Sequence, residues 1–271
     1  MPSKKETAAR ATEIFEHCSY PNGLNANTAW LGIYQALLWY ESTGGTELLP
    51  HIIDADKLRQ PTYKGDKAKG GSRPWIERAR RVHLYLCEKL GCSSSKVIQH
   101  FDLLMRSTGY EGLQRQNPLG IAFAELVAHV LRRFGSPQIA NKTEVPAHEV
   151  FPGVSLQSRS ANPKIDLVAF KAGKPVGIVT TKWSIRHDRL TDVIDEAITY
   201  KSAAMRTGLK LPCCFVTNEF DPARLDKLLK AKVVDAVVHV NPELVTQVCR
   251  LNERLRELRD IPYLISASTK W

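Results

Sequence analysis

The chain has 271 residues, 43% of them hydrophobic and 24% charged, which is typical of a globular protein able to bury one large core or two modest ones. It has no apolar run near the ~20 residues that span a bilayer, and residues 1–15 contain no signal-peptide apolar region, so we expect a cytoplasmic protein with no membrane partner. The formal net charge of +10 favours a polyanionic partner such as nucleic acid, because phosphate contacts gain affinity by counterion release.

The first part of the sequence predicts helices. Helical periodicity runs from Ser3 to about Cys18, from Asn25 to Glu41, from near Pro74 to before Gly91, and through residues 93–109. The aromatic residues here have the spacing of a packed core rather than of a surface for stacking bases. We therefore expect an N-terminal all-helical domain over residues 1–114, to which no motif assigns a function.

A basic, glycine-containing loop lies between the second and third predicted helices. Residues 63–73 read YKGDKAKGGSR and include Lys64, Lys67, Lys69 and Arg73. These side chains could contact a DNA backbone, or the segment could be a solvated linker. The sequence leaves both interpretations open.

Beyond a polar, turn-rich boundary at residues 107–118 the pattern changes to alternating helices and strands. We predict helices at 117–135, 187–208, 221–231 and 242–258, and strands at 139–145, 164–170, 176–183, 212–218 and 233–240. This order predicts an α/β domain over residues 115–271, with a mixed sheet flanked by helices.

An aspartate and a lysine lie on the two strands of a predicted hairpin. A turn over residues 172–174 pairs positions whose numbers sum to about 346, which places Asp166 opposite Thr180 and one diagonal step from Lys182. Because side chains alternate along a strand, all three point to the same face. Asp166 and Lys182 alone could form an ordinary cross-strand ion pair.

A second carboxylate weakens the case for an ordinary ion pair. Glu196 lies among apolar residues of the next predicted helix, so we expect it to face the sheet. Two carboxylates can hold Mg²⁺, which prefers one or two carboxylates together with water and phosphate. With Lys182 to stabilise charge, this is the donor set of a phosphodiester-cleaving site in which Asp166 and Glu196 bind Mg²⁺.

These residues resemble the PD-(D/E)xK nuclease fold, and more specifically the type II restriction endonucleases that cut around a CCGG core (the AgeI and BsaWI group). In that group a glutamate from the following helix replaces the acidic residue two positions before the lysine. Here Thr180 stands at that position and Glu196 would be the substitute. The family's glutamate on the helix before the sheet would correspond to Glu125, as a catalytic residue that supports the metal ligands or binds a second metal ion. Ile165 stands where the family label has proline.

The resemblance also assigns base recognition to Arg186, Asp188 and Arg189, and His187 between them could contact the backbone. Arginine donates two hydrogen bonds to guanine, and aspartate accepts from the cytosine amino group, so these residue types suit a CCGG site. The alternative is that Asp188 only caps the following helix.

The resemblance implies a Mg²⁺-dependent site-specific deoxyribonuclease of a bacterial or archaeal cytoplasm, acting on double-stranded DNA. A palindromic site implies at least a homodimer, and the family implies cleavage before the first C, 5′-CCGG overhangs and a cognate DNA methyltransferase. Two alternatives stay open. One is a structure-specific repair or recombination nuclease of the same fold. The other is an inactive DNA-binding relative, suggested by Thr180.

Overall fold

The computed structural model describes residues 4–16, 23–42, 85, 88–89, 118–156, 161–183, 185, 190–248 and 253–271. The elements named in these segments are α1 (Lys4–Glu16), α2 (Ala29–Ser42), α7 (Pro118–Phe134), β1 (Ile139–Pro146), α8 (Ala147–Val150), β2 (Lys164–Lys171), β3 (Lys174–Lys182), α9 (Leu190–Arg206), β4 (Cys213–Thr217), α10 (Pro222–Ala231), β5 (Ala236–His239), α11 (Pro242–Val248), the 3-10 helix η3 (Glu253–Glu257) and α12 (Ile261–Ser268). Across these segments, every helix is too short or too polar to cross a membrane.

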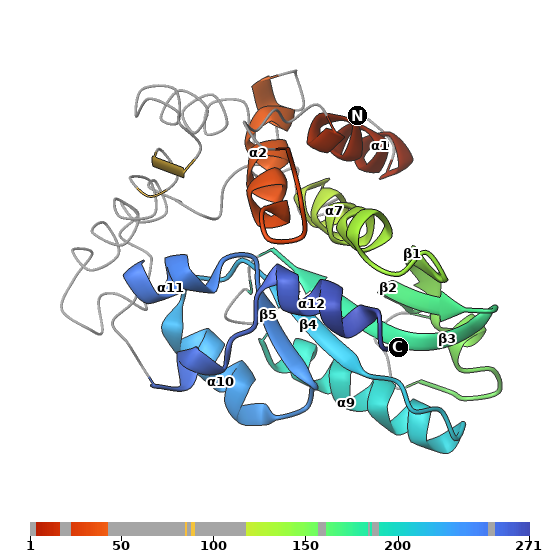
Figure 1. Cartoon of the computed structure of the whole chain (residues 1–271). Helices are drawn as coiled ribbons and strands as arrows, with labels where there is room; N and C mark the ends of the chain where they lie inside the picture. Colours follow the sequence, from red (N-terminus) through yellow and green to blue (C-terminus); the bar gives the residue numbers. More distant parts are fainter. Residues whose placement is uncertain are drawn as a thin grey trace.

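The strands form one five-stranded sheet in the order β1-β2-β3-β4-β5. Pairing is antiparallel from β1 to β3 and parallel from β3 to β5. The parallel pairs need crossover connections, which α9 and α10 supply. In Figure 1, α7 and α12 lie over one face of the sheet and α9 lies against the other. The predicted α/β fold with a mixed sheet is confirmed.

The β2–β3 hairpin turns at Ala172 and Gly173, which both have positive φ (49° and 77°). Such a two-residue turn matches the twist of the flanking strands, and glycine adopts this conformation without strain. Lys171 pairs with Lys174, and an irregularity after Ala169 shifts the register by one residue. Beyond this shift Leu167 pairs with Val179, whose numbers sum to 346 as the sequence predicts.

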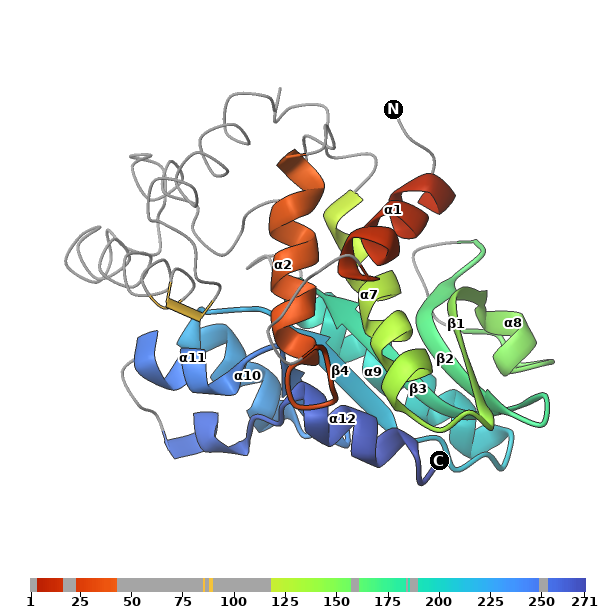
Figure 2. The ribbon, with the colours of Figure 1, turned by 45° about the horizontal axis from the view of Figure 1, so that its top comes forward.

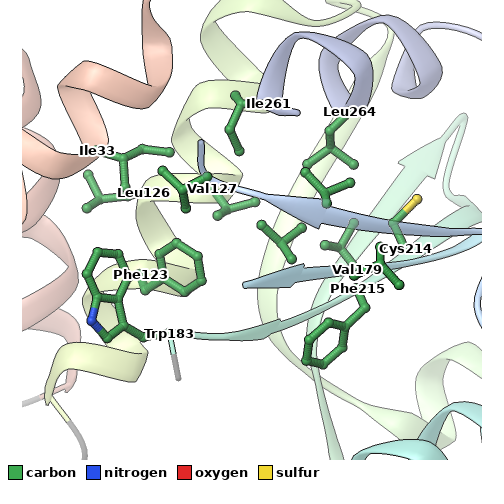
Figure 3. Close-up of a cluster of buried hydrophobic side chains, with 14 of the residues drawn as sticks. Ile33, Phe123, Leu126, Val127, Val179, Trp183, Cys214, Phe215, Ile261 and Leu264 are labelled. Carbon is green, nitrogen blue, oxygen red and sulfur yellow. The ribbon is translucent and has the colours of Figure 1, made fainter. Parts of the chain in front are cut away.

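Alternation along β2 and β3 divides the side chains between two packed layers. The odd-numbered Leu167 and Val179 belong to the cluster that contains the apolar face of α7, part of which Figure 3 shows. The even-numbered Val168 and Ile178 pack with Tyr200 of α9 in a second cluster. Asp166 and Lys182 have the even parity, so their side chains lie on the α9 face of the sheet.

Helices α1 and α2 pack on α7, beside which Figure 2 places them. Phe15 and Tyr34 are fully buried in the same cluster as α7 and the sheet, which confirms core packing for these two predicted core aromatics. The domain boundary expected near residue 115 stays a prediction, since much of residues 43–117 lies outside the described part of the chain.

The C-terminal segment differs from the single helix predicted over residues 242–258. The structure has α11 and η3 there, followed by a further helix, α12, which the sequence analysis missed. Asp260 caps α12 by accepting a 2.7 Å hydrogen bond from the backbone N of Tyr263, and Pro262 lies in the first turn. Asp260 and Pro262 are both signals of a helix start, so the sequence itself could have predicted where α12 begins.

The last residue, Trp271, covers Gly177 of β3. A Cβ at Gly177 would lie 2.6 Å from Cε3 of the Trp271 ring, closer than packed atoms allow. We predict that Gly177→Ala lowers the free energy of unfolding by about 1–3 kcal/mol, because the ring must move. Urea denaturation followed by circular dichroism measures this change.

The matched control is the same substitution in a Trp271→Ala background. There we expect the cost of Gly177→Ala to fall toward zero, because the obstructing ring is gone. An equal cost in both backgrounds would show that the contact with Trp271 does not limit this position.

Candidate active site

Asp166 and Lys182 form an ion pair across the end of the β2–β3 hairpin. Lys182 Nζ lies 2.7 Å from Asp166 Oδ2, and 34% and 20% of the respective side chains are exposed. The two predicted residues therefore meet on the α9 face, at a place partly open to solvent.

The ion pair lies where the two strands separate. The β2–β3 ladder ends at the pair Leu167–Val179, whereas β3 remains paired with β4 as far as Lys182 and Thr217. Beyond the ladder, the backbone N of Thr181 donates a 2.9 Å hydrogen bond to Asp166 Oδ2. The Asp166 carboxylate thus replaces a backbone acceptor of the ladder, which holds it beside Lys182.

Glu196 approaches the same pair from α9. Tyr200, four residues further on, donates a 2.8 Å hydrogen bond from its hydroxyl to Glu196 Oε1. The Tyr200 ring is 4% exposed and stacks on Phe151. Residues four apart lie on one face of a helix, so Tyr200 restricts the Glu196 carboxylate. Tyr200 was missed by the sequence analysis, although the i,i+4 spacing could have indicated it.

The pKa values of Lys182 and Glu196 depend on each other's charge and on the charge of Asp166. Burial raises the pKa of Glu196, and Asp166 raises it further, while Lys182 and the Tyr200 hydroxyl only partly oppose these effects. Burial by itself would lower the pKa of Lys182, but Asp166 and Glu196 outweigh it and leave that pKa raised. Lys182 is therefore protonated at neutral pH. Opposed shifts of this kind, from burial and charge partners together, are frequent at functional sites.

The donor set is compatible with a divalent cation. Asp166 and Glu196 offer hard carboxylate oxygens, and a cation would relieve the repulsion that raises the pKa of Glu196. Within the described segments, no three His, Cys, Asp or Glu side chains cluster closely enough to hold a metal ion by themselves. A cation here would therefore take water or phosphate oxygens as its remaining ligands, as Mg²⁺ commonly does.

Glu125 lies elsewhere. It forms an ion pair with Arg132, and its Oε2 accepts a 3.0 Å hydrogen bond from the hydroxyl of Thr143. Thr143 pairs with Leu167, so Glu125 is on the α7 face of the sheet, opposite the Asp166 side chain. The structure thus does not bring Glu125 to the Asp166–Lys182 pair, and the catalytic role expected for Glu125 stays a prediction.

Glu144 on β1 is a further charge that the sequence analysis did not single out. It has a positive φ of 53°. Its Oε2 lies 2.8 Å from Lys4 Nζ and 3.8 Å from Lys164 Nζ. Its charge contributes to the raised pKa of Lys182, after Asp166 and Glu196. Nothing in the residue pattern of β1 indicates this position, which depends on the local backbone conformation.

The remaining predicted residues lie outside the described part of the chain. They are the base-recognition residues Arg186, Asp188 and Arg189, and the backbone-contact residues Lys64, Lys67, Lys69, Arg73 and His187. Their roles stay predictions.

No protein-family model and no curated protein matches the sequence. Among solved structures, the chain is similar to restriction endonuclease PspGI in a complex with substrate DNA, at 12% identity over 100% of this chain and 93% of that chain, with a TM-score of 0.47. It is also similar to metal-depleted Ecl18kI in complex with uncleaved, modified DNA, at 14% identity over 97% and 77% of the two chains, with a TM-score of 0.42. These similarities are distant.

We predict that Glu196→Gln increases the free energy of unfolding at about pH 7. Because the folded-state pKa of Glu196 is raised, the ionised carboxylate destabilises the folded protein above that pKa. The destabilisation disappears once the pH falls below the pKa of the unfolded chain, about 4.3. Urea denaturation at about pH 7 and about pH 3.5 should therefore show a gain that shrinks toward zero in acid.

Asp195→Asn is the matched control, because Asp195 is the exposed neighbour of Glu196 on α9. Its effect should stay within about 0.5 kcal/mol at both pH values. A loss of stability in Glu196→Gln at neutral pH would mean that attraction to Lys182 outweighs burial, contrary to this account.

Proposed function

We propose that the protein is a type II restriction endonuclease of the PD-(D/E)xK fold, which hydrolyses double-stranded DNA at a palindromic site with a CCGG core. The observation that carries the proposal is the convergence of Asp166, Lys182 and Glu196. The first two lie 2.7 Å apart at the end of the hairpin ladder, and Glu196 is coupled to both through charge. Two carboxylates that can hold a metal ion and a cationic amine can together promote phosphodiester hydrolysis.

In this proposal Lys182 provides a positive charge and does not act as a general base. Its pKa is raised, so at neutral pH it carries a proton and cannot accept another. With a third of its side chain exposed, the ammonium group can reach a phosphate while keeping its contact with Asp166. It would stabilise the negative charge that develops on the phosphate in the transition state.

Asp166 and Glu196 would hold Mg²⁺. The bound ion supplies positive charge for the phosphate and lowers the pKa of the attacking water. Tyr200 keeps the Glu196 carboxylate oriented through its 2.8 Å hydrogen bond, and Asp166 is fixed by Thr181 and Lys182. The two carboxylates are thus positioned by the protein before any substrate binds.

Direct attack by water, without a covalent intermediate, suits the groups near the site. Cys213 packs in the same cluster as Tyr200, and burial raises the pKa of its thiol to about 11. The thiol is therefore protonated at neutral pH and a poor nucleophile. Cys213 is therefore unsuited to form a covalent intermediate, and we propose water as the nucleophile.

Sequence recognition is assigned to Arg186, Asp188 and Arg189, which follow the catalytic strand in the chain. Arginines match guanine and aspartate matches cytosine, so the set suits a CCGG core. A palindrome requires a two-fold symmetric assembly, so we propose a homodimer or higher oligomer that cuts before the first C and leaves 5′-CCGG overhangs. A cognate methyltransferase would protect the host DNA. Lys64, Lys67, Lys69, Arg73 and His187 are proposed backbone contacts.

We predict that Asp166→Ala abolishes Mg²⁺-dependent cleavage of a plasmid that carries CCGG sites, because the variant lacks one metal-binding carboxylate and the partner of Lys182. Binding to a CCGG duplex in Ca²⁺ should persist. Gel assays of cleavage and fluorescence anisotropy of binding measure the two properties, and Asp195→Asn serves as the matched carboxylate control.

Three outcomes would contradict the proposal. Cleavage by Asp166→Ala at the wild-type rate would exclude this site. Wild-type protein that binds CCGG duplexes with Mg²⁺ but leaves them intact would be an inactive DNA-binding relative. Wild-type cleavage that does not depend on CCGG would indicate a structure-specific nuclease of the same fold.

We predict that Arg186→Ala reduces discrimination between CCGG and singly substituted duplexes by about 1–3 kcal/mol for each base that the arginine reads. Non-specific binding should change little, because phosphate contacts elsewhere remain. Competition binding in Ca²⁺ with the two kinds of duplex measures the ratio. An equal fall in affinity for both duplexes would assign Arg186 to the backbone instead.

A further inference from the structure

The chain that leaves β3 is held at Ile185 by hydrogen bonds between the Ile185 backbone and two side chains. The backbone N of Ile185 donates a 2.8 Å hydrogen bond to Glu219 Oε2, and its carbonyl accepts a 2.7 Å hydrogen bond from Arg224 Nη1. The Ile185 side chain is 1% exposed. Both backbone groups of one residue are therefore fixed by charged partners, three positions beyond Lys182.

Glu219 is buried, Arg224 is half-buried, and the two are paired. Arg224 Nη1 lies 3.2 Å from Glu219 Oε2, and 17% and 7% of the two side chains are exposed. Glu219 Oε1 accepts a 2.8 Å hydrogen bond from the backbone N of Asp221. Burial raises the pKa of Glu219, and Arg224 and the backbone donors only partly oppose it.

Burying such a pair does not by itself explain its presence. The desolvation of two charges offsets much of their attraction, and apolar replacements of buried ion pairs often leave stability unchanged or improve it. A role in fixing one arrangement of the backbone is the attested alternative. The Glu219–Arg224 pair has the geometry for that role, because both side chains also form hydrogen bonds with the backbone of Ile185.

In the sequence, Ile185 lies between Lys182 and the proposed base-reading residues 186–189. Lys182 pairs with Thr217 of β4, and the backbone N of Asn218 donates a 3.0 Å hydrogen bond to the carbonyl of Trp183. Trp183 and Ile185 therefore lie beside the loop after β4, which contains Glu219. In sequence, residues 186–189 with the proposed base-reading side chains come next.

The loop that contains Glu219 is fixed in turn to β5. His239 is fully buried, its Nε2 lies 3.0 Å from the carbonyl of Glu219, and its Nδ1 accepts a 3.0 Å hydrogen bond from the backbone N of Asn241. Burial lowers the pKa of His239 to about 4, so the ring is neutral and Nε2 carries its proton toward Glu219. The loop that holds Ile185 is thus anchored to the end of β5, the edge strand of the sheet.

We propose that Glu219 and Arg224 are positioning residues for sequence specificity. They fix the backbone of Ile185, from which the chain continues in sequence to the proposed base-reading residues 186–189. This inference rests on the proposed function. It adds that discrimination between DNA sites depends on a buried ion pair that contacts no DNA itself.

The test compares Glu219→Gln, Arg224→Lys and the paired variant Glu219→Leu/Arg224→Met with wild type. The paired variant removes both charges together, so neither Glu219 nor Arg224 is left without the other, and Asp221 keeps its hydrogen bonds from the backbone N of Ala223 and of residue 224. Each is assayed for kcat/KM with Mg²⁺ on a CCGG duplex and on a duplex with one base pair of the core changed. Arg254→Gln is the control, because it removes an arginine whose Nε lies 3.1 Å from the Asp226 carboxylate of α10.

We expect the ratio of the two kcat/KM values to fall about 5- to 150-fold in the three variants, as when a base-reading side chain is removed, and to stay unchanged in Arg254→Gln. An unchanged ratio in folded variants, with only a lower melting temperature, would overturn the inference and leave the pair a structural one. Wild-type protein with no preference for CCGG would instead overturn the proposed function, on which the inference rests.

Discussion

The ion pair between Asp166 and Lys182 is the interaction on which the site depends. It forms where β3 leaves the ladder with β2 but continues beside β4, so that a side-chain carboxylate takes over from backbone acceptors. The same place is reached by Glu196 from the helix that connects β3 to β4, because that crossover must return across the sheet face.

Strand alternation keeps the core and the site apart over a very short stretch of chain. Trp183 is 3% exposed and packs edge-on against Phe123 of α7, while its neighbour Lys182 faces the carboxylates on the other side of the sheet. Packing of one residue therefore fixes the direction of the next. Burial raises the pKa of Glu196 and the charge of Asp166 raises it further, and a divalent cation would offset both effects. The site is thus held ready at some expense of stability.

Much of this arrangement follows from residue order alone. The sum of 346 across the hairpin and the even parity of Asp166 and Lys182 follow from strand geometry, and the apolar neighbours of Glu196 orient it toward the sheet. What the sequence does not contain is where the ladder stops, since that depends on Asp166 accepting from Thr181 across strands. The position of Glu125 was predicted by analogy, and its pairing with Arg132 and Thr143 comes from packing on the α7 face. Likewise the hydrogen bonds of Glu219 and Arg224 with Ile185 join residues far apart in the chain, so no local sequence pattern predicts them.

The most direct measurement of the central claim is anomalous diffraction from crystals of the protein with a CCGG duplex and Mn²⁺ in place of Mg²⁺. A manganese peak bound by the carboxylates of Asp166 and Glu196, with the Lys182 ammonium group beside the same phosphate, is the result that this account predicts. Manganese bound elsewhere, or carboxylates too far apart to share one ion when DNA is present, would contradict it.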